Sequence, residues 1–184
     1  LFRDAFDAVE VSSWFDAHRC EKVVVKPLVG ANADHITVLS KPISVKAMAS
    51  LGETYASRPF FVQPFMESIR TEGEYSTFFF NGEYSHAILK KPAVNDFRAQ
   101  EEHGAEILSV PAPQALIDTA HDVVALVEPR PLYVRADFVR NDHDQFLVME
   151  LEMIEPSLYL RADPGSAARF ARAVNEWFEV LTGK

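Results

Sequence analysis

The dipeptide Asn81-Gly82 separates two runs of residues that favour extended structure, EYSTFFF (74–80) and EYSHAILK (83–90). A two-residue type I′ turn needs positive φ angles at both central positions, which asparagine and glycine adopt at low cost. The sequence therefore predicts an antiparallel hairpin here. This hairpin is the clearest local prediction of secondary structure in the sequence.

The rest of the chain alternates between helical and extended patterns. We expect helices over residues 2–18, 43–56, 112–128 and 166–181, where apolar residues recur at helical spacing. Short apolar runs predict strands at 22–27, 36–40, 60–65, 131–140 and 145–153. Hairpin strands with helices at intervals indicate an α+β fold with mostly antiparallel sheets.

Composition excludes several classes of protein. The 184 residues carry a formal net charge of −9, which disfavours a nucleic-acid partner. No apolar run is long enough to span a membrane, and the first residues do not resemble a signal peptide. The single Cys20 excludes an internal disulfide and suits a reducing, cytoplasmic compartment. Because the chain starts at Leu1 within a helical pattern, we expect a piece of a longer protein.

The strands 131–140 and 145–153 carry a group of acidic residues. With a four-residue turn at 141–144, Arg140 pairs with Gln145, so that Asp137 lies opposite Val148 and Arg135 lies opposite Glu150. Arg135, Asp137, Glu150 and Glu152 then share one face, and carboxylates at this spacing suit Mg²⁺. The alternative is an ordinary solvated face of an edge hairpin.

The opposite face of the same hairpin favours the metal interpretation. It is apolar and must pack on a core; its residues are Val134, Ala136, Phe138, Leu147, Met149, Leu151 and Met153. A face with three carboxylates beside an arginine needs an ion or a ligand to offset the repulsion between the acids. The prediction depends on register, because a three- or five-residue turn would place Asp137 on the other face.

Other segments carry groups that suit a nucleotide. Lys26 ends an apolar strand before a loop that contains Gly30, and a lysine there can reach a phosphate. The segment 63–67 can offer backbone groups to an adenine edge. Lys90, Lys91 and Arg98 follow the central hairpin and can supply charge to a triphosphate. Each of these features is also compatible with ordinary strand ends and scattered surface cations.

In their order along the chain, six segments resemble the ATP-grasp superfamily, near the glutathione-synthetase-like and ribosomal-protein-modifying ligases. They are VVVKPLVGANA (23–33), FVQPFMESI (61–69), EGEYSTFFFNGEYSHAILKKP (72–92), DFRAQEEHGA (96–105), YVRADFV (133–139) and FLVMELEMIEPS (146–157). The last segment is also similar to ATP-grasp proteins grouped with the cycloserine-biosynthesis ligase, and Arg-x-Asp at 135–137 resembles D-alanine–D-alanine ligase.

The resemblance implies an ATP-grasp fold of two lobes, at about 22–64 and about 65–184, with the nucleotide in the cleft between them. The family's N-terminal domain is expected to lie outside this chain. The implied reaction joins a carboxylate to an amine or a related nucleophile through an acyl phosphate, with ATP and Mg²⁺ (or Mn²⁺) as cofactors. The implied substrates are a small-molecule carboxylate and an amine. A homo-oligomer is a further expectation.

The resemblance also implies roles for single residues. Lys26 would contact adenine or the α-phosphate, Gln63 and Phe65 would line the adenine pocket, and Glu67 would bind the ribose. Three cationic residues would face the phosphates and the acyl-phosphate transition state, with Arg98 and Arg135 in catalytic roles; they are Lys90, Arg98 and Arg135. The implied Mg²⁺ ligands are Asp137, Glu150 and Glu152.

Two features depart from the family pattern. Glu152 stands where an asparagine is usual, and the loop 30–35 reads GANADH, with one glycine where a phosphate-covering loop usually has several. Two other functions stay open on the sequence. One is a non-catalytic nucleotide-binding or interaction module, and the other is a metal-dependent phosphoesterase that uses the cluster Asp142-His143-Asp144.

Overall fold

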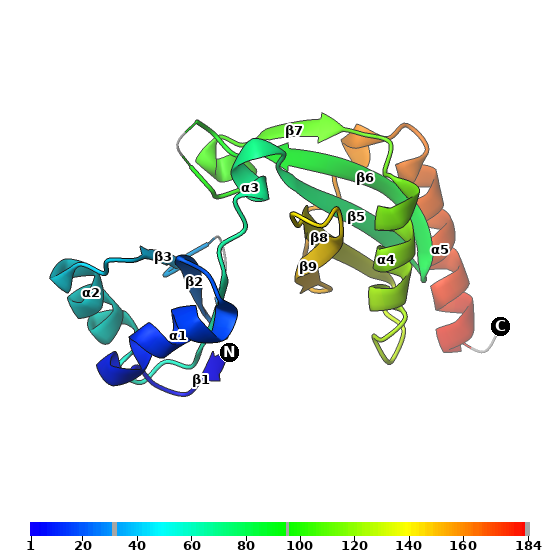
Figure 1. The fold of residues 1–184 in the computed structure, drawn as a ribbon. Coiled ribbons are helices and arrows are strands. Elements are labelled where there is room, and N and C mark those ends of the chain that lie inside the picture. Colours follow the sequence, from blue (N-terminus) through cyan, green and yellow to red (C-terminus); the bar gives the residue numbers. More distant parts are fainter. Residues whose placement is uncertain (31–32, 95, 183–184) are drawn as a thin grey trace. The chain divides into compact units, whose positions relative to one another are not determined.

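The computed structural model describes residues 1–30, 33–94 and 96–182. The chain divides into two compact units, Leu1–Met66 and Glu67–Lys184 (Figure 1). Each unit contains one sheet whose strand pairs are all antiparallel, with helices beside it. This arrangement confirms the predicted α+β class. Of the predicted phosphate loop 28–35, Ala31 and Asn32 lie outside the described residues.

The first unit holds a four-stranded sheet in the order β1-β4-β2-β3. The strands are β1 (Phe2–Arg3), β2 (Lys22–Pro27), β3 (Thr37–Ser40) and β4 (Phe60–Pro64), and the helices are α1 (Val11–His18) and α2 (Val45–Tyr55). One side of the sheet packs against both helices through a core that includes Trp14, Phe15, Val23, Val25, Leu51, Tyr55, Phe60 and Val62.

The predicted helix over residues 2–18 starts later than expected. Phe2 pairs with Phe61 of β4, so the chain begins as an edge strand. A 3₁₀ helix follows at Ala8–Glu10, and the Asp7 side chain caps it by accepting a hydrogen bond from the Val9 amide. Strand pairing therefore overrides the helical spacing of the first apolar residues.

The second unit holds a five-stranded sheet in the order β7-β6-β5-β8-β9. Its strands are β5 (Glu74–Phe80), β6 (Glu83–Lys91), β7 (Glu106–Ser109), β8 (Tyr133–Arg140) and β9 (Phe146–Glu152). The turn between β5 and β6 is confirmed, because Asn81 and Gly82 have φ angles of 50° and 84°. The sequence did not predict β1, β7 or the short helix α3 (Ser68–Thr71).

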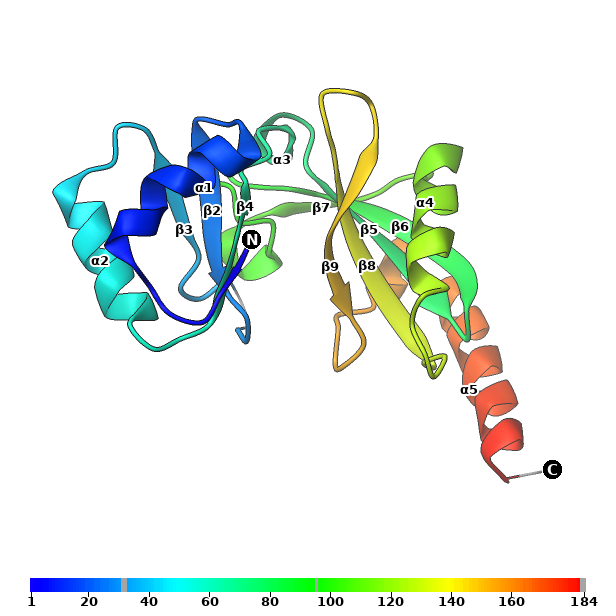
Figure 2. The ribbon, with the colours of Figure 1, turned by 60° about the horizontal axis from the view of Figure 1, so that its bottom comes forward.

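The two faces of this second sheet differ in what covers them. Helix α4 (Gln114–Val124) lies along one face (Figure 2), over a core that includes Phe79, Val134, Ala136 and Phe138. At the turn end of β5 and β6, the other face is apolar, and the covering elements there are α5 (Ser166–Thr182) and the 3₁₀ helix Leu160–Ala162. Farther from the turn, this second face carries charged side chains.

Two bulges set the register of the second sheet. Phe78 pairs with His86 but Phe79 pairs with Tyr84, so Ser85 is an additional residue of β6. Likewise Asp137 pairs with Glu150 but Phe138 pairs with Val148, so Met149 is an additional residue of β9. Each bulge shifts all later pairs by one residue, which moves side chains to the opposite face.

Within the described residues, no helix combines the length and the apolar character that a membrane span requires.

Candidate metal centre

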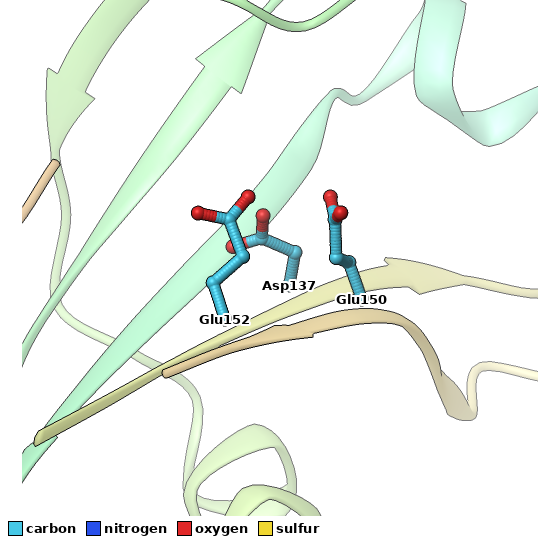
Figure 3. Close-up of side chains that lie close together, drawn as sticks. All are labelled: Asp137, Glu150 and Glu152. Atoms are coloured by element: carbon cyan, nitrogen blue, oxygen red, sulfur yellow. The ribbon is translucent and has the colours of Figure 1, made fainter. Parts of the chain in front are cut away.

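Three carboxylates from two neighbouring strands lie close together on the second sheet. Asp137 of β8 is directly opposite Glu150 of β9, and Glu152 is two residues farther along β9. Their side chains project from the same side of the hairpin (Figure 3). Each residue offers one carboxylate oxygen that is within 4.8 Å of the other two. Among the described His, Cys, Asp and Glu residues, no other group of three meets this distance.

The structure brings these acids together by a register that the sequence did not predict. The connecting turn has five residues, because Arg140 pairs with Phe146. Strict alternation would then place Asp137 opposite Met149. The bulge at Met149 restores the shared face, with Asp137 opposite Glu150 and Arg135 opposite Glu152. The predicted pairs of Asp137 with Val148 and of Arg135 with Glu150 are therefore wrong.

The apolar face of this hairpin is only partly as predicted. Val134, Ala136 and Phe138 are buried in the core under α4. Leu147 and Met153, which we expected in the same core, are 40% and 38% exposed. β9 is the edge strand of the sheet, and beyond the bulge its alternation no longer matches the simple pattern.

Arg135 links two of the three acids. Its Nε lies 3.1 Å from both carboxylate oxygens of Asp137, and its Nη2 donates to Glu152. Asp137 is 1% exposed and Arg135 is 9% exposed, so this ion pair is largely removed from water. The guanidinium is thus fixed beside the acids by its bonds to Asp137 and Glu152.

Lys90 of β6 reaches Asp137 from the other side. Its ammonium lies 3.0 Å from the Asp137 carboxylate and 3.0 Å from that of Glu74 on β5. Burial acts to lower the pKa of Lys90, but the charges of Asp137 and Glu74 outweigh it and raise that pKa. The lysine therefore stays charged in a buried position.

The electrostatics of this cluster suit an added cation. Two cationic groups, Lys90 and Arg135, face four carboxylates, those of Glu74, Asp137, Glu150 and Glu152. Burial acts to raise the pKa of Asp137, yet Lys90 and Arg135 hold it below its ordinary value. Burial raises the pKa of Glu152, and the charge of Arg135 opposes this change. A divalent cation would balance the excess of two negative charges.

The donor set also fits the geometry of Mg²⁺. Hard carboxylate oxygens at roughly 2.0–2.1 Å are its preferred ligands, so opposite ligands lie about 4.2 Å apart. The 4.8 Å spread of the three oxygens is close to that value. Glu150 is exposed and Glu152 is half-buried, so rotations of these two side chains can close the remaining difference. The site would leave further coordination positions to water or phosphate oxygens.

Two other predicted residues of the second unit make local contacts. Arg98 forms a fork with Asp96, with 2.7 Å between Nη2 and Oδ2, and its side chain is 40% exposed. The hydrogen bonds from Arg98 hold the pKa of Asp96 well below its ordinary value. Glu67 pairs with Arg70 at 3.7 Å.

The remaining predicted residues belong to the first unit and share one face of its sheet. Lys26 pairs with Phe61, and Gln63 pairs with Val24, two residues from Lys26. Strand alternation places their side chains opposite Val23 and Val25, which face α1 and α2. Phe65 donates its amide to the Lys22 carbonyl and carries the Lys22 ammonium over its ring at 4.9 Å. The strands thus align Lys26, Gln63 and Phe65 on the side without helices.

Sequence reasoning missed Glu74 and Ser76. With a two-residue turn and regular pairing, Glu74 would lie opposite Leu89 and not opposite Lys90. The bulge at Ser85 places it opposite Lys90 instead, and Ser76 lies opposite Asp137. Glu74 and Ser76 are two residues apart on one strand, so their side chains share a face. This spacing identifies them as neighbours of Lys90 and Asp137 only once the bulge is known.

The cluster Asp142-His143-Asp144 is part of the turn. The Asn141 side-chain oxygen accepts a hydrogen bond from the His143 amide, and Arg140 forms an ion pair with Asp144. These contacts are those of a closed turn, as expected for such residues. None of the three residues belongs to the carboxylate group described above.

Comparison with known proteins gives a consistent result. A family model described as "Prokaryotic glutathione synthetase, ATP-grasp domain" matches residues 7–135. The cycloserine biosynthesis protein DcsG of Streptomyces lavendulae is 30% identical over an alignment that covers 92% of this chain and 60% of that protein. The chain thus spans about three fifths of the length of this curated relative.

Solved structures share the fold. The crystal structure of the D-cycloserine synthetase DcsG aligns with a TM-score of 0.75 at 24% identity, over 91% of this chain and 60% of that one. The D-alanine–D-alanine ligase from Bacillus anthracis, complexed with ATP, aligns with a TM-score of 0.60 at 16% identity, over 95% of this chain and 56% of that one. At these identities the likeness concerns the fold alone.

Proposed function

Because this chain belongs to the family of the prokaryotic glutathione synthetase ATP-grasp domain, we propose that it binds ATP with a divalent cation as part of a carboxylate–amine ligase. The observation that carries the proposal is the convergence of Asp137, Glu150 and Glu152 beside a fixed arginine. The fold and the donor chemistry of this cluster support the same conclusion independently.

In this proposal, the three acids hold Mg²⁺, or Mn²⁺ in its place, and the cation neutralises charge on the phosphates. Arg135 already points its guanidinium at the acids, so it is placed to contact a phosphate oxygen at the same centre. Lys90 and Arg98 add positive charge. Lys26 would contact adenine or the α-phosphate, Gln63 and Phe65 would line the adenine pocket, and Glu67 would bind the ribose.

The proposed reaction has two steps. A substrate carboxylate oxygen bonds to the γ-phosphorus while the bond to the bridging oxygen of ADP breaks, which leaves an acyl phosphate and ADP. An amine or a related nucleophile then attacks the acyl carbon, loses a proton and expels phosphate. Such phosphoryl transfer needs positioning and charge stabilisation more than a covalent nucleophile. Arg135 suits this role because its buried stem fixes the guanidinium.

Calorimetric titration tests the proposal. We expect Mg-ADP and Mg-ATP to bind the protein, and Glu150→Gln to weaken binding at least about tenfold, roughly 1.4 kcal/mol. Glu83→Gln is the matched control, since this exposed glutamate lies at the turn end of β6. Titrations with EDTA separate metal-dependent from metal-independent binding. Equal affinity in wild type and Glu150→Gln would reject the metal assignment.

The ligase step needs a separate measurement. In the full-length protein, release of ADP should depend on a carboxylate substrate, and hydroxylamine should trap the acyl phosphate. Mg-ATP binding without any carboxylate-dependent ADP release would instead identify a nucleotide-binding module.

A further inference from the structure

We propose that Glu74 is a positioning residue of this centre, which holds the Lys90 ammonium and, through Lys90, fixes the carboxylate of Asp137. The inference rests on the proposed function, because it assumes that Asp137 is a cation ligand. It changes the role of Lys90, which becomes chiefly a support for Asp137 and only secondarily a contact for phosphate.

Lys90 of β6 contacts acidic residues on two other strands, Glu74 of β5 and Asp137 of β8. The Lys90 ammonium lies 3.0 Å from Glu74 Oε1 and 3.0 Å from Asp137 Oδ2. The side chains of Lys90, Glu74 and Asp137 are 5%, 13% and 1% exposed. Water therefore competes little with these bonds, and Lys90 is the group that joins Glu74 to Asp137.

The pairing of three strands brings Glu74, Lys90 and Asp137 together. β5 lies between β6 and β8, so a side chain on β5 can influence both neighbours. The bulge at Ser85 puts Glu74 opposite Lys90, and Asp137 lies opposite Ser76, two residues along β5. If Ser85 were paired regularly with Phe78, Glu74 would lie opposite Leu89 and the lysine would turn to the side of α4.

The balance of charges explains why Glu74 matters. Lys90 makes two charge-assisted hydrogen bonds, one to Glu74 and one to Asp137, so Asp137 does not receive its charge alone. Lys90 and Arg135 both donate to Asp137 Oδ2, and Arg135 Nε also reaches Oδ1. Burial raises the pKa of Glu74, and the charge of Lys90 opposes this, so the pair is mutually dependent.

Lys90 has limited capacity for a phosphate. An ammonium has three N–H donors, and two of them point at Glu74 and Asp137. A residue that orients a metal ligand in this way typically affects metal affinity strongly. Loss of Glu74 should therefore change the binding of the cation more than the binding of metal-free nucleotide.

A double-mutant cycle tests the proposal. Glu74→Gln, Lys90→Gln and the double variant are compared by calorimetry with Mn-ADP and, in EDTA, with ADP alone. We expect Glu74→Gln to weaken Mn-ADP binding at least about fivefold and metal-free ADP binding less than about twofold. In the Lys90→Gln background, Glu74→Gln should have no further effect. If Glu74→Gln weakened binding equally in both backgrounds, Glu74 would act through its charge at a distance and not through Lys90. That result would overturn the proposal.

Two further variants keep the test decisive. Glu72→Gln removes the same charge two residues away, where the side chain contacts Arg140 and Tyr75, and should leave Mn-ADP affinity unchanged. Glu74→Asp retains the charge but shortens the side chain, and serves if Glu74→Gln does not fold. Wild-type Mn-ADP affinity in Glu74→Asp would contradict the proposal.

The outcome also separates this inference from the proposed function. If wild type does not bind Mn-ADP, the metal centre itself is wrong. If Glu150→Gln weakens binding and Glu74→Gln does not, the centre stands and only the role of Glu74 is refuted. The Mn²⁺ electron paramagnetic resonance spectrum of the ADP complex adds a readout of ligand geometry, which should broaden in Glu74→Gln and stay unchanged in Glu72→Gln.

Discussion

Asp137 lies directly opposite Glu150, although the five-residue turn between their strands would by regular alternation pair Asp137 with Met149. The bulge at Met149 therefore decides which face of the hairpin carries the acids. Because Met149 stands outside the regular pairing, Glu150 and Glu152 follow Val148 as they would in its absence, and the proposed cation ligands meet.

Deletion of Met149 should leave the centre intact. Without this residue, Glu150 and Glu152 follow Val148 in regular pairing and stay opposite Asp137 and Arg135. We expect the Mg-ADP affinity to stay within about threefold of wild type. This change in binding free energy is smaller than the roughly 1.4 kcal/mol of a tenfold change. Deletion of Leu151 is the matched change, because it moves Glu152 opposite Ala136, on the side of α4. Calorimetry should then show at least a tenfold loss, roughly 1.4 kcal/mol. Equal losses in both deletions would contradict this assignment of the bulge.

Substitution of Arg135 should affect cation and nucleotide in opposite directions. The guanidinium contacts Asp137 and Glu152, so it opposes a cation bound to the same oxygens. Arg135→Gln should tighten Mn²⁺ binding in the absence of nucleotide and weaken Mg-ATP binding at least about tenfold, since a phosphate contact is lost. Electron paramagnetic resonance measures free Mn²⁺ in the first titration, and calorimetry measures the second. A change in the same direction for both ligands would refute this role.

Two glycines should respond oppositely to alanine. Gly82 has a φ angle of +84°, and an added Cβ would lie 3.1 Å from Arg130 Cδ. Gly82→Ala should therefore lower the free energy of unfolding by about 1–2 kcal/mol. Gly52 lies within α2, where an added Cβ would meet Phe6 at 3.6 Å, an ordinary contact. Gly52→Ala should raise the free energy of unfolding by up to about 1 kcal/mol. Urea unfolding curves of the two variants check both signs.

Tyr55 should make the protein less stable at high pH. Burial raises the pKa of Tyr55 to about 12 in the folded state, and the hydroxyl donates its hydrogen bond to the His35 carbonyl, with the Val25 carbonyl 3.4 Å away. The unfolded chain ionises this tyrosine near its ordinary pKa of about 10. The associated stability is complete below that pH and is lost as the pH rises toward 12.

Comparison with Tyr55→Phe isolates this contribution, because the variant lacks the ionisable hydroxyl. The difference in free energy of unfolding between wild type and Tyr55→Phe should shrink as the pH rises from about 10 to about 12. Other tyrosines contribute equally to both proteins. A difference that stays constant over this interval would contradict the burial of the Tyr55 hydroxyl.

The elements of the fold were predictable where local signals were strong. Asn81-Gly82 predicted its hairpin, and helical spacing predicted α2, α4 and α5 within a few residues. The structure of the first residues was not predictable, because Phe2 pairs with β4, a strand that is distant in sequence. Short strands such as β7 have four residues and little pattern of their own, and they form because an exposed edge of β6 is available.

The grouping of the three acids was predictable, but the register of their strands was not. Asp137, Glu150 and Glu152 carry the chemistry that Mg²⁺ requires, and their type and order are visible in the chain. The bulges at Ser85 and Met149 depend on packing of whole strands, and no residue at either position signals one. Glu74 was overlooked for this reason, because its partner Lys90 lies one residue beyond the regular pairing.

All three proposed cation ligands belong to one hairpin, β8 and β9, within residues 137–152. The spacing of their oxygens is therefore encoded in a short continuous stretch. Insertions or exchanges in the region between β6 and β8 can alter what surrounds the hairpin without moving these atoms apart. A gene that inherits this stretch therefore inherits the three acids together, as a single block.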